Sequence, residues 1–539
     1  MRQSRHTLVF VWEVLVSLGL ASVSLAIEHG RPGGQPYELA GRRIVFSTWY
    51  YVRPGQPDWQ DDAGVSRYAK RLAYPADALH YTYEDRPHGV RLRAEAAQRT
   101  GPVIAPERPW EQRGISVSTL LLDEGRYRLW AASRDKNLKW RGVYYESADG
   151  RNWQRPNLGQ VEFEGSRDNN LLAFNAESVF KDPAGPAAER YKCVWHGDYD
   201  PKRFEEFKKT RPYSTIALEM DPGRVHAILG AVSPDGLSWT QLPDALSVEP
   251  SDTHIVGYYD LRLAKYVLYT RSYMVGPRAP GFPPPSPAIY QFLARRAIGR
   301  TESADFRAFA PAETIIEPGP DSAPTDQYYS NCRTTVPDGP DQHLLFPAVF
   351  HLDTDNTSIE LHASYDGKLW HRVPGSPVLD TAAWGQWDGG CIFTSPELTE
   401  LPDGSWVLPY TGFKNTHKYP SGLDACGFGL AVWPKGRLVA IEAPGDGGFT
   451  TEGLVPPGGR LRINAVTART GSILIEAADL EGKPIPGRGF AEAVPIVGDQ
   501  VWAPVKWKTV DDLGIKSGEP VVLRFRMNHA RIYGLQFDQ

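Results

Sequence analysis

One seven-residue pattern, Ser-x-Asp-Gly-x-x-Trp, occurs three times in this chain and constrains its fold more than any other feature. The copies begin at Ser147, Ser233 and Ser364. Each follows a run of strand-forming residues, and its Asp-Gly pair is typical of a tight hairpin turn, because glycine accepts a positive φ. The same turn at the same place in successive units predicts a repeated antiparallel sheet.

Two further units keep this layout without the full motif, one beginning near Ile255 and one near Ile392. Five units of roughly 60 to 85 residues, each with four strand-like runs, predict an all-β protein with a five-bladed β-propeller over residues 115–445. An array of β-sandwiches is the alternative, but the repeated turn favours blades. Helical periodicity is nearly absent.

The segments on either side of the predicted propeller differ from it. After Gly445, runs such as Leu461–Ala465 alternate apolar and polar residues between Gly and Pro turns. This pattern predicts a separate C-terminal β-sandwich over residues 446–539. Residues 27–114 hold scattered strand-like runs and are interpreted as a β-rich lead-in segment.

The first 26 residues are typical of a secretory signal peptide. Arg2 and Arg5 precede a mainly apolar run, and Ser24-Leu25-Ala26 offers a cleavage site of the small-x-small type. A membrane anchor is the alternative, but Glu13 interrupts the run, which is short for a bilayer span. We therefore expect a secreted or periplasmic protein, with no membrane span in the mature chain.

Composition excludes some classes of partner. The net charge is −5 without a basic block, which gives no electrostatic footprint for nucleic acid. Aromatic residues make up 11% of the chain and suit both stacking on sugar rings and packing inside propeller blades, so both interpretations stay open. No EF-hand or histidine-rich spacing occurs, so we predict no locally bound metal and no cofactor. The oligomeric state stays open.

The cysteines are too few and too dispersed for a disulfide scaffold. A bridge between Cys332 and Cys391 is geometrically conceivable, but buried thiols are favoured. The four residues are Cys193, Cys332, Cys391 and Cys426.

The repeated motif, Phe346-Pro347, Trp387-Asp388-Gly389 and the tail together carry a resemblance. The chain resembles the five-bladed glycoside hydrolases of the invertase, arabinanase and mannoside-phosphorylase type, and more closely a group of exported bacterial hydrolase-like propeller proteins. The resemblance implies a carbohydrate substrate and a site at the mouth of the propeller. It predicts a glycoside hydrolase; a non-catalytic carbohydrate-binding propeller is the alternative, followed by a phosphorylase, a lyase or a sialidase-like enzyme.

Breaking an acetal needs an acid that protonates the leaving oxygen and a carboxylate that acts as base or nucleophile. In a propeller such groups lie where the innermost strands begin. Glu177, directly before the run Ser178–Phe180, is the predicted general acid, and Asp388 is the predicted base or nucleophile. Asp182-Pro183 resembles an invertase signature but follows its strand, so we interpret Asp182 as a turn residue.

Other side chains near the predicted strand starts are candidates for substrate binding. They are Glu111, Asp252, His254, Asp326, Arg333, Trp387 and His417.

One departure from the invertase pattern bears on catalysis. Thr394-Ser395-Pro396-Glu397-Leu398 aligns with the Glu-Cys-Pro-Asp-Leu signature of invertases, which places Thr394 where that family has its acid. By the two-residue alternation of a strand, Glu397 falls on the opposite face. Either Glu177 has taken over the role of the acid, or the protein no longer catalyses an invertase-like reaction.

Overall fold

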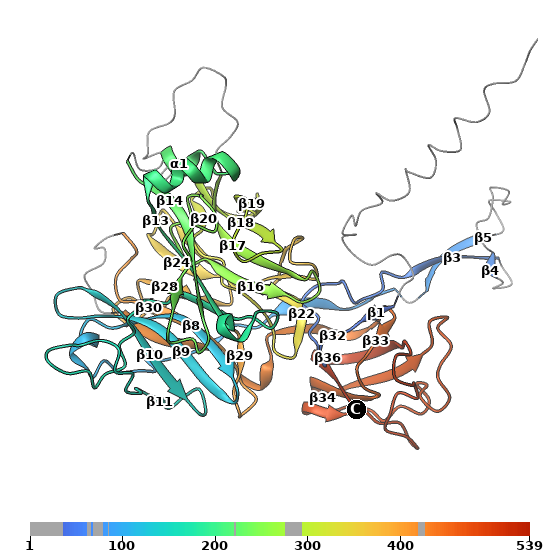
Figure 1. The fold of residues 1–539 in the computed structure, drawn as a ribbon. Coiled ribbons are helices and arrows are strands. Elements are labelled where there is room, and N and C mark those ends of the chain that lie inside the picture. Colours follow the sequence, from blue (N-terminus) through green and yellow to red (C-terminus); the bar gives the residue numbers. More distant parts are fainter. Residues whose placement is uncertain are drawn as a thin grey trace, which may run out of the picture.

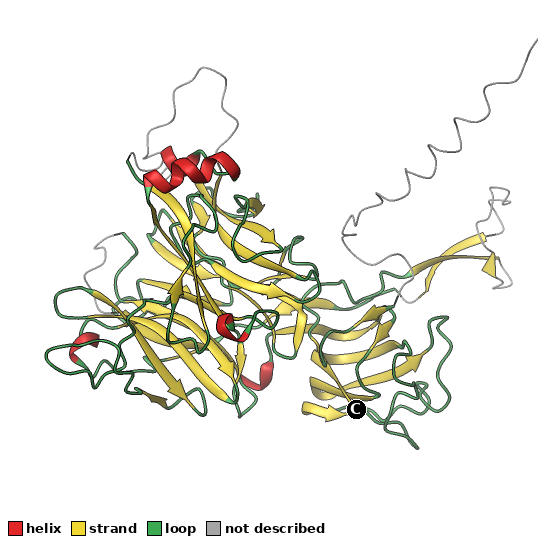
Figure 2. Cartoon of the chain, viewed as in Figure 1, coloured by secondary structure: helices red, strands yellow, loops and turns green. Residues whose placement is uncertain are grey.

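A computed structural model describes residues 36–61, 66–67, 79–84, 86–219, 223–274, 294–418 and 426–539. The predicted signal peptide, residues 1–26, lies outside these ranges. The described chain is mostly β-strand, which confirms the all-β prediction (Figure 2). None of the helices in the described ranges is both long and apolar enough to cross a membrane.

Three consecutive four-stranded antiparallel sheets follow the lead-in segment. Unit 1 contains β8 (Ile115–Asp123), β9 (Arg126–Arg134), β10 (Trp140–Ser147) and β11 (Trp153–Gln154). Unit 2 contains β12 (Ser178–Lys181), β13 (Tyr191–Tyr199), β14 (Val225–Ser233) and β15 (Thr240–Gln241), with α1 (Pro201–Thr210) and α2 (Ile216–Glu219) inserted before β14. Unit 3 contains β16 (Val256–Asp260), β17 (Lys265–Met274), β18 (Arg295–Ser303) and β19 (Glu313–Ile316).

The next two units are less regular. Unit 4 is divided into two four-stranded sheets. One consists of β20 (Asp326–Tyr328), β23 (Ala348–His351), β24 (Asn356–Ile359) and β27 (Leu379–Asp380), and the other of β21 (Arg333–Val336), β22 (Gly339–Leu345), β25 (His362–Ser364) and β26 (His371–Arg372). Unit 5 consists of β28 (Cys391–Thr394), β29 (Thr399–Glu400), β30 (Trp406–Phe413), β31 (Cys426–Trp433) and β7 (Gln98–Thr100).

The outer strand of unit 5 therefore comes from the lead-in segment, since β7 pairs antiparallel with β31. Val439–Ala443 lie inside the range predicted for the propeller, but they belong to β32 (Val439–Thr450), which pairs with strands of the six-stranded sheet described below. The boundary predicted at residue 445 thus cuts through a strand. The pairing of β7 with β31 joins segments more than 300 residues apart, so a local sequence pattern could not predict it.

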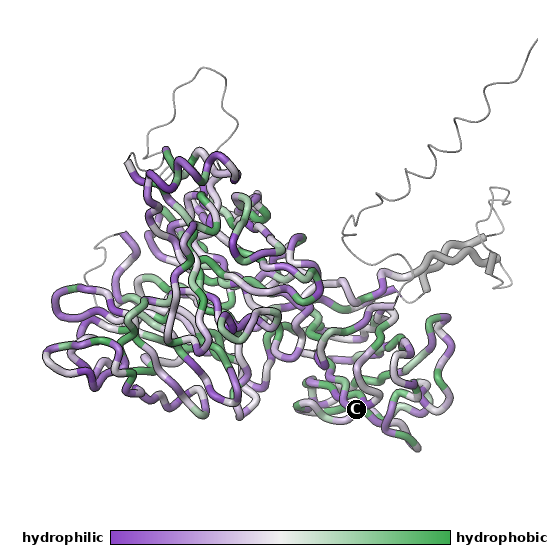
Figure 3. Tube along the Cα trace, viewed as in Figure 1, coloured by the Kyte–Doolittle hydropathy of each residue, from purple (hydrophilic) through white to green (hydrophobic). Residues whose placement is uncertain are grey.

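The C-terminal part contains one six-stranded sheet beside the five units (Figure 1). Its strands are β2 (Arg43–Ile44), β6 (Arg91–Ala94), β32, β34 (Arg460–Ala478), β35 (Asp499–Pro504) and β36 (Val522–Asp538). A two-stranded parallel sheet joins β1 (Tyr37–Glu38) to β33 (Leu454–Val455), and β3 (Gln56–Asp61), β4 (Ser66–Arg67) and β5 (Leu79–Glu84) form a projecting sheet. Hydrophobic and hydrophilic stretches alternate along the trace of the five units and of the C-terminal part (Figure 3).

The repeated motif makes the same turn in all three copies. The motif serine hydroxyl accepts a hydrogen bond from the N–H of the motif glycine at 2.9, 2.8 and 2.9 Å in chain order. The aspartate carboxylate accepts from the two N–H groups that follow the glycine. The three glycines have φ of 71°, 77° and 69°, a backbone region that favours glycine.

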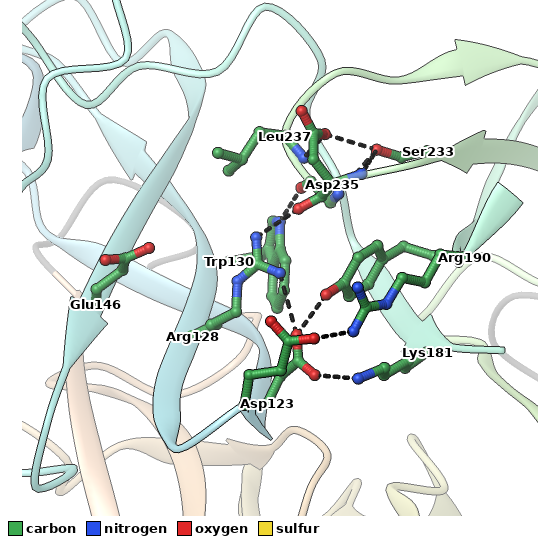
Figure 4. Close-up of polar contacts among 12 residues, drawn as sticks. Asp123, Arg128, Trp130, Glu146, Lys181, Arg190, Ser233, Asp235 and Leu237 are labelled. Carbon is green, nitrogen blue, oxygen red and sulfur yellow. Dashed lines mark hydrogen bonds and ion pairs between the residues drawn. The ribbon is translucent and has the colours of Figure 1, made fainter. Parts of the chain in front are cut away.

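The turn of unit 2 also fastens unit 2 to unit 1 (Figure 4). Trp130 Nε1 donates to the carbonyl of Gly236 at 2.8 Å, and Arg128 Nη2 donates to the carbonyl of Asp235 at 2.6 Å. Arg128 pairs in addition with Asp123 at 3.4 Å. The motif therefore stabilises contacts between neighbouring sheets as well as its own hairpin.

Similar hydrogen bonds join the other units in sequence order and bring unit 5 against unit 1. They run from Tyr266 Oη to Asp182 (2.8 Å), from Tyr269 Oη to the Gly367 carbonyl (2.5 Å), from Thr357 Oγ1 to the Ile392 carbonyl (2.7 Å) and from Ser395 Oγ to the Val117 carbonyl (3.0 Å). Asp182 is thus a buried structural residue, as predicted.

All four cysteines are free and buried, which confirms the prediction of buried thiols over a Cys332–Cys391 bridge.

Candidate functional site

All five units contribute to one cavity of about 400 Å³, a volume within the range of small-molecule sites. Its walls carry hydroxyl groups, aromatic rings, three histidines and one glutamic acid. The lining side chains used below are Ser118, Trp140, Glu177, His196, Thr253, His254, Tyr329, Phe393, Thr394, Phe413 and His417. This combination of apolar walls with a few polar groups is typical of a binding or catalytic pocket.

Glu177 stands one residue before β12, and the neighbouring unit holds it there. Thr119 Oγ1 donates to the Glu177 carbonyl at 3.0 Å and accepts from the N–H of Val179 at 3.1 Å. Among the described residues, none forms a hydrogen bond or an ion pair with the Glu177 carboxyl group. Burial therefore acts alone and raises the pKa of Glu177 from 4.5 to about 7. The side chain lines the cavity, as the strand-start argument predicted.

Three histidines share the cavity with Glu177. Burial lowers the pKa of His254 to about 4 and is the main reason that the pKa of His417 falls to about 3; it also lowers the pKa of His196. Within the described chain, His196 Nδ1, His254 Nε2 and His417 Nε2 are buried without a hydrogen-bond partner. All three rings are therefore neutral at pH 7 and keep unused hydrogen-bonding capacity.

Asp388, the predicted base or nucleophile, does not line the cavity. The residue is 1% exposed, and its carboxylate pairs with Arg99 Nη1 at 3.0 Å and accepts from Tyr410 Oη at 2.9 Å. Trp387 stacks on Tyr410 beside it instead of facing the cavity. The physical reason is β7, which brings Arg99 to this carboxylate from the lead-in segment. The two predicted catalytic carboxylates therefore do not face one pocket.

Thr394 lies on the cavity wall and donates through Oγ1 to the Phe346 carbonyl at 2.6 Å. Glu397 lies away from the cavity, where it accepts from Thr334 Oγ1 at 2.9 Å, and burial raises its pKa. The carboxyl group of the invertase signature is thus absent from the cavity wall, as the alignment indicated.

Of the predicted substrate-binding residues, His254 and His417 line the cavity. Asp252 lies next to the lining residue Thr253 and pairs with Arg271. Burial opposes the charge of Asp252, but Arg271 and Tyr273 outweigh it and lower the pKa to about 2. Asp252 is therefore a carboxylate that the ion pair with Arg271 keeps negatively charged at the edge of the site.

The remaining predicted residues have structural partners outside the cavity. Glu111 is fully buried and accepts from Tyr145 Oη and Arg155 Nε. Asp326 pairs with His351 at 2.7 Å. Arg333 lies 3.3 Å from the centroid of the Tyr258 ring and donates to a neighbouring histidine.

Sequence reasoning missed several lining residues. His196 lies on β13, the second strand of unit 2, whereas the sequence prediction considered only the starts of first strands. Trp140 begins the third strand of unit 1, and Tyr329 lies between β20 and β21, where unit 4 is split. Position before a first strand identified Glu177 and His254 as lining residues. No sequence pattern marked the lining side chains that come from other strands.

Within the described ranges, no group of three or more His, Cys, Asp or Glu side chains is arranged to hold a metal ion. The three cavity histidines therefore do not form such a group.

The chain matches no known family model and no curated protein. Among solved structures it is similar to a glycoside hydrolase at 10% identity and a TM-score of 0.37, over 63% of this chain and 92% of the other. It is also similar to an α-L-arabinofuranosidase from Podospora anserina in complex with cellotriose, at 12% identity and a TM-score of 0.36, over 63% of this chain and 98% of the other. A third similar structure is an N-acetylgalactosamine deacetylase from F. plautii in complex with blood group B trisaccharide, at 13% identity and a TM-score of 0.35, over 71% of this chain and 94% of the other. At these identities and TM-scores, the similarities establish neither activity nor substrate.

Proposed function

We propose that this protein is an exported glycoside hydrolase that cleaves oligo- or polysaccharides in the cavity shared by its five units. One observation carries the proposal: Glu177 lines that cavity with a carboxyl group that has no partner in the described chain and a pKa of about 7. A carboxylic acid that keeps its proton near neutral pH is the group that glycosidases use to protonate the leaving oxygen.

The walls of the cavity fit a sugar. Trp140, Tyr329, Phe393 and Phe413 offer ring faces and edges that pack on the apolar side of a pyranose or furanose. Ser118 and Thr253 offer hydroxyl groups, and the neutral histidines offer further donors or acceptors for sugar hydroxyls. Because the described lining contains no Arg or Lys, it gives no support to a phosphorylase, a lyase or a sialidase-like enzyme that receives an anion.

The proposal includes the finer architecture. We infer that units 1–5 are the blades of a five-bladed propeller and that the C-terminal part is a β-sandwich. The hydrogen bonds that join each unit to the next and unit 5 to unit 1 support the first inference. The six-stranded sheet with its own large hydrophobic core supports the second. Export rests on the signal-like residues 1–26.

A non-catalytic carbohydrate-binding propeller is the second candidate function. It is favoured by the position of Asp388, because the described lining then contains one carboxyl group where a two-carboxylate mechanism needs two.

The two functions are separated by assaying a panel of 4-nitrophenyl glycosides and of plant and algal glycans with wild type, Glu177→Gln and the exposed control Glu162→Gln. Hydrolysis by wild type and Glu162→Gln, with binding but little hydrolysis by Glu177→Gln, supports the hydrolase. Binding without hydrolysis by all three proteins would instead assign the binding function. Equal hydrolysis by all three would remove Glu177 from the mechanism.

A further inference from the structure

We propose that the six-stranded sheet of the C-terminal part carries a second binding site, whose ligand is an acidic sugar. The site is a cavity of about 600 Å³, lined by residues of β32, β34 and β36 and of the segment that follows β5. In the described chain it shares no lining residue with the cavity that contains Glu177. The side chains that carry the argument are Arg86, His88, Glu476, Phe490, Arg524 and Arg526.

The sheet places two arginines on the cavity side. Arg524 and Arg526 stand two residues apart on β36, so the alternation of a strand puts both side chains on the same face. Phe525 between them belongs to the hydrophobic core of the C-terminal part. In the strand register, Arg524 lies opposite Glu476 of β34, whereas Arg526 lies opposite Gly448 of β32.

The two arginines of β36 differ in their partners. Arg524 Nη1 donates to Glu476 Oε1 at 3.0 Å and to the Gly482 carbonyl at 2.7 Å. Arg526 and Arg86 form no ion pair with any residue that the structure describes, and Glu476 is the one acidic side chain among the described lining residues. The cavity therefore presents two guanidinium groups whose charge a ligand can neutralise.

The guanidinium group of Arg526 is held in place by an aromatic ring. Its Cζ lies 4.0 Å from the centroid of the Phe490 ring. Phe490 is held in turn, because its N–H donates to Oε2 of Glu476, a residue that is 6% exposed. A guanidinium that is already oriented loses less conformational freedom when it binds an anion.

His88 adds a hydrogen-bonding group to the same wall. Two backbone hydrogen bonds, of 3.0 and 2.9 Å, join it to Gly448. A Cβ at Gly448 would lie 3.1 Å from His88 Cε1, so the glycine makes room for the ring. His88 Nδ1 lies 3.3 Å from the Arg86 carbonyl, and because a carbonyl only accepts, Nδ1 carries the proton in the neutral ring. Nε2 is then an acceptor for a sugar hydroxyl.

These groups together favour an acidic sugar as the ligand. Guanidinium groups bind carboxylates and sulfates through paired N–H donors, which Arg86 and Arg526 supply. The cavity is far larger than one small anion needs and lies within the range of small-molecule sites. Phe490 and His88 offer contacts for a ring and its hydroxyls. A net charge of −5 without a basic block disfavours a nucleic acid.

Binding to the full-length protein at pH 7 is measured by isothermal titration calorimetry. The ligands are trigalacturonic acid, its neutral methyl ester, a sulfated carrageenan tetrasaccharide and sodium sulfate. We expect wild type to bind one or both acidic oligosaccharides, and the tighter of the two identifies the anion as carboxylate or sulfate. The methyl ester should bind at least about tenfold more weakly than trigalacturonic acid, because it has lost the charge.

Variants of Arg526 test where the acidic oligosaccharide binds. Arg526→Gln removes the charge and should weaken binding about 10- to 100-fold, while Arg526→Lys, which keeps the charge, should retain part of the affinity. Arg469→Gln removes an exposed arginine of β34 outside the cavity and is the matched control, expected to bind as wild type does. The Arg526 side chain is exposed, so thermal unfolding of its variants should stay near wild type.

Three outcomes overturn the inference: no binding of either acidic oligosaccharide by wild type, equal affinity for trigalacturonic acid and its ester, or wild-type affinity in Arg526→Gln. Sulfate ion bound as tightly as the oligosaccharides would show a small-anion site only and exclude the sugar. These measurements involve no hydrolysis. Their failure therefore leaves the proposed hydrolase standing, and a protein without hydrolytic activity leaves this site standing.

Discussion

Glu177 and His254 line the same cavity, which thus holds a protonated carboxyl group and a neutral imidazole near neutral pH. Burial produces both states, since it disfavours the charged form of each side chain. The two residues are more than 70 positions apart in the sequence, and both reach the cavity because the first strands of units 2 and 3 lie next to each other.

The pH dependence of hydrolysis should follow Glu177. The acid must be protonated, so the rate should fall as the pH rises through about 7. The measurement is kcat/KM from pH 3 to 9. A basic limb near pH 4.5, the ordinary value for glutamate, would mean that Glu177 is not held in its protonated form.

Glu177→Gln should stabilise the protein, and more so at higher pH. The native state keeps the proton of Glu177 up to about pH 7, while the unfolded chain releases it near 4.5, so wild type loses stability as the pH rises between these values. The glutamine variant does not titrate. We expect its advantage to grow by up to about 3 kcal/mol from pH 4 to pH 8, measured by denaturant unfolding. A difference that is independent of pH would contradict the raised pKa.

Asp388→Asn should act on stability instead of catalysis. The carboxylate is buried between Arg99 and Tyr410, so its neutralisation removes an ion pair that fastens β7 to unit 5. We expect a loss of about 1.5 to 3 kcal/mol in urea unfolding, with kcat changed by no more than about twofold. Asp380→Asn, at an exposed side chain nearby, is the control. A large fall in kcat without a loss of stability would restore Asp388 to the active site.

Gly236→Ala should expose the structural role of the repeated motif. Gly236 has a φ of 77°, and an added Cβ would lie 2.9 Å from the Trp130 ring of unit 1. Gly159 also has a positive φ, 64°, but faces open space. Gly159→Ala should therefore cost about 1 kcal/mol for backbone strain, and Gly236→Ala about 2 to 4 kcal/mol because it also separates two sheets. Equal losses in denaturant unfolding would mean that the turn stabilises its own hairpin alone.

Local patterns predicted the parts of the molecule that depend on local geometry. The Asp-Gly turns, the order of strands within units 1–3 and the position of Glu177 before β12 all follow from short stretches of sequence. Pairing over long distances could not be predicted. Arg99 neutralises a carboxylate nearly 300 residues away, and that contact removes Asp388 from the site. His196 reaches the cavity from a second strand, and nothing in the sequence of that strand indicates which of its residues face a ligand.

The proposed hydrolysis requires that Glu177 keep its proton to near-neutral pH inside the shared cavity. The direct measurement is a ¹³C NMR titration of glutamate-labelled protein, with Glu177→Gln to assign the resonance. We expect a side-chain carboxyl carbon that titrates with a pKa of about 7 in wild type and is missing in the variant. A Glu177 carbon that titrates near 4.5 would contradict it.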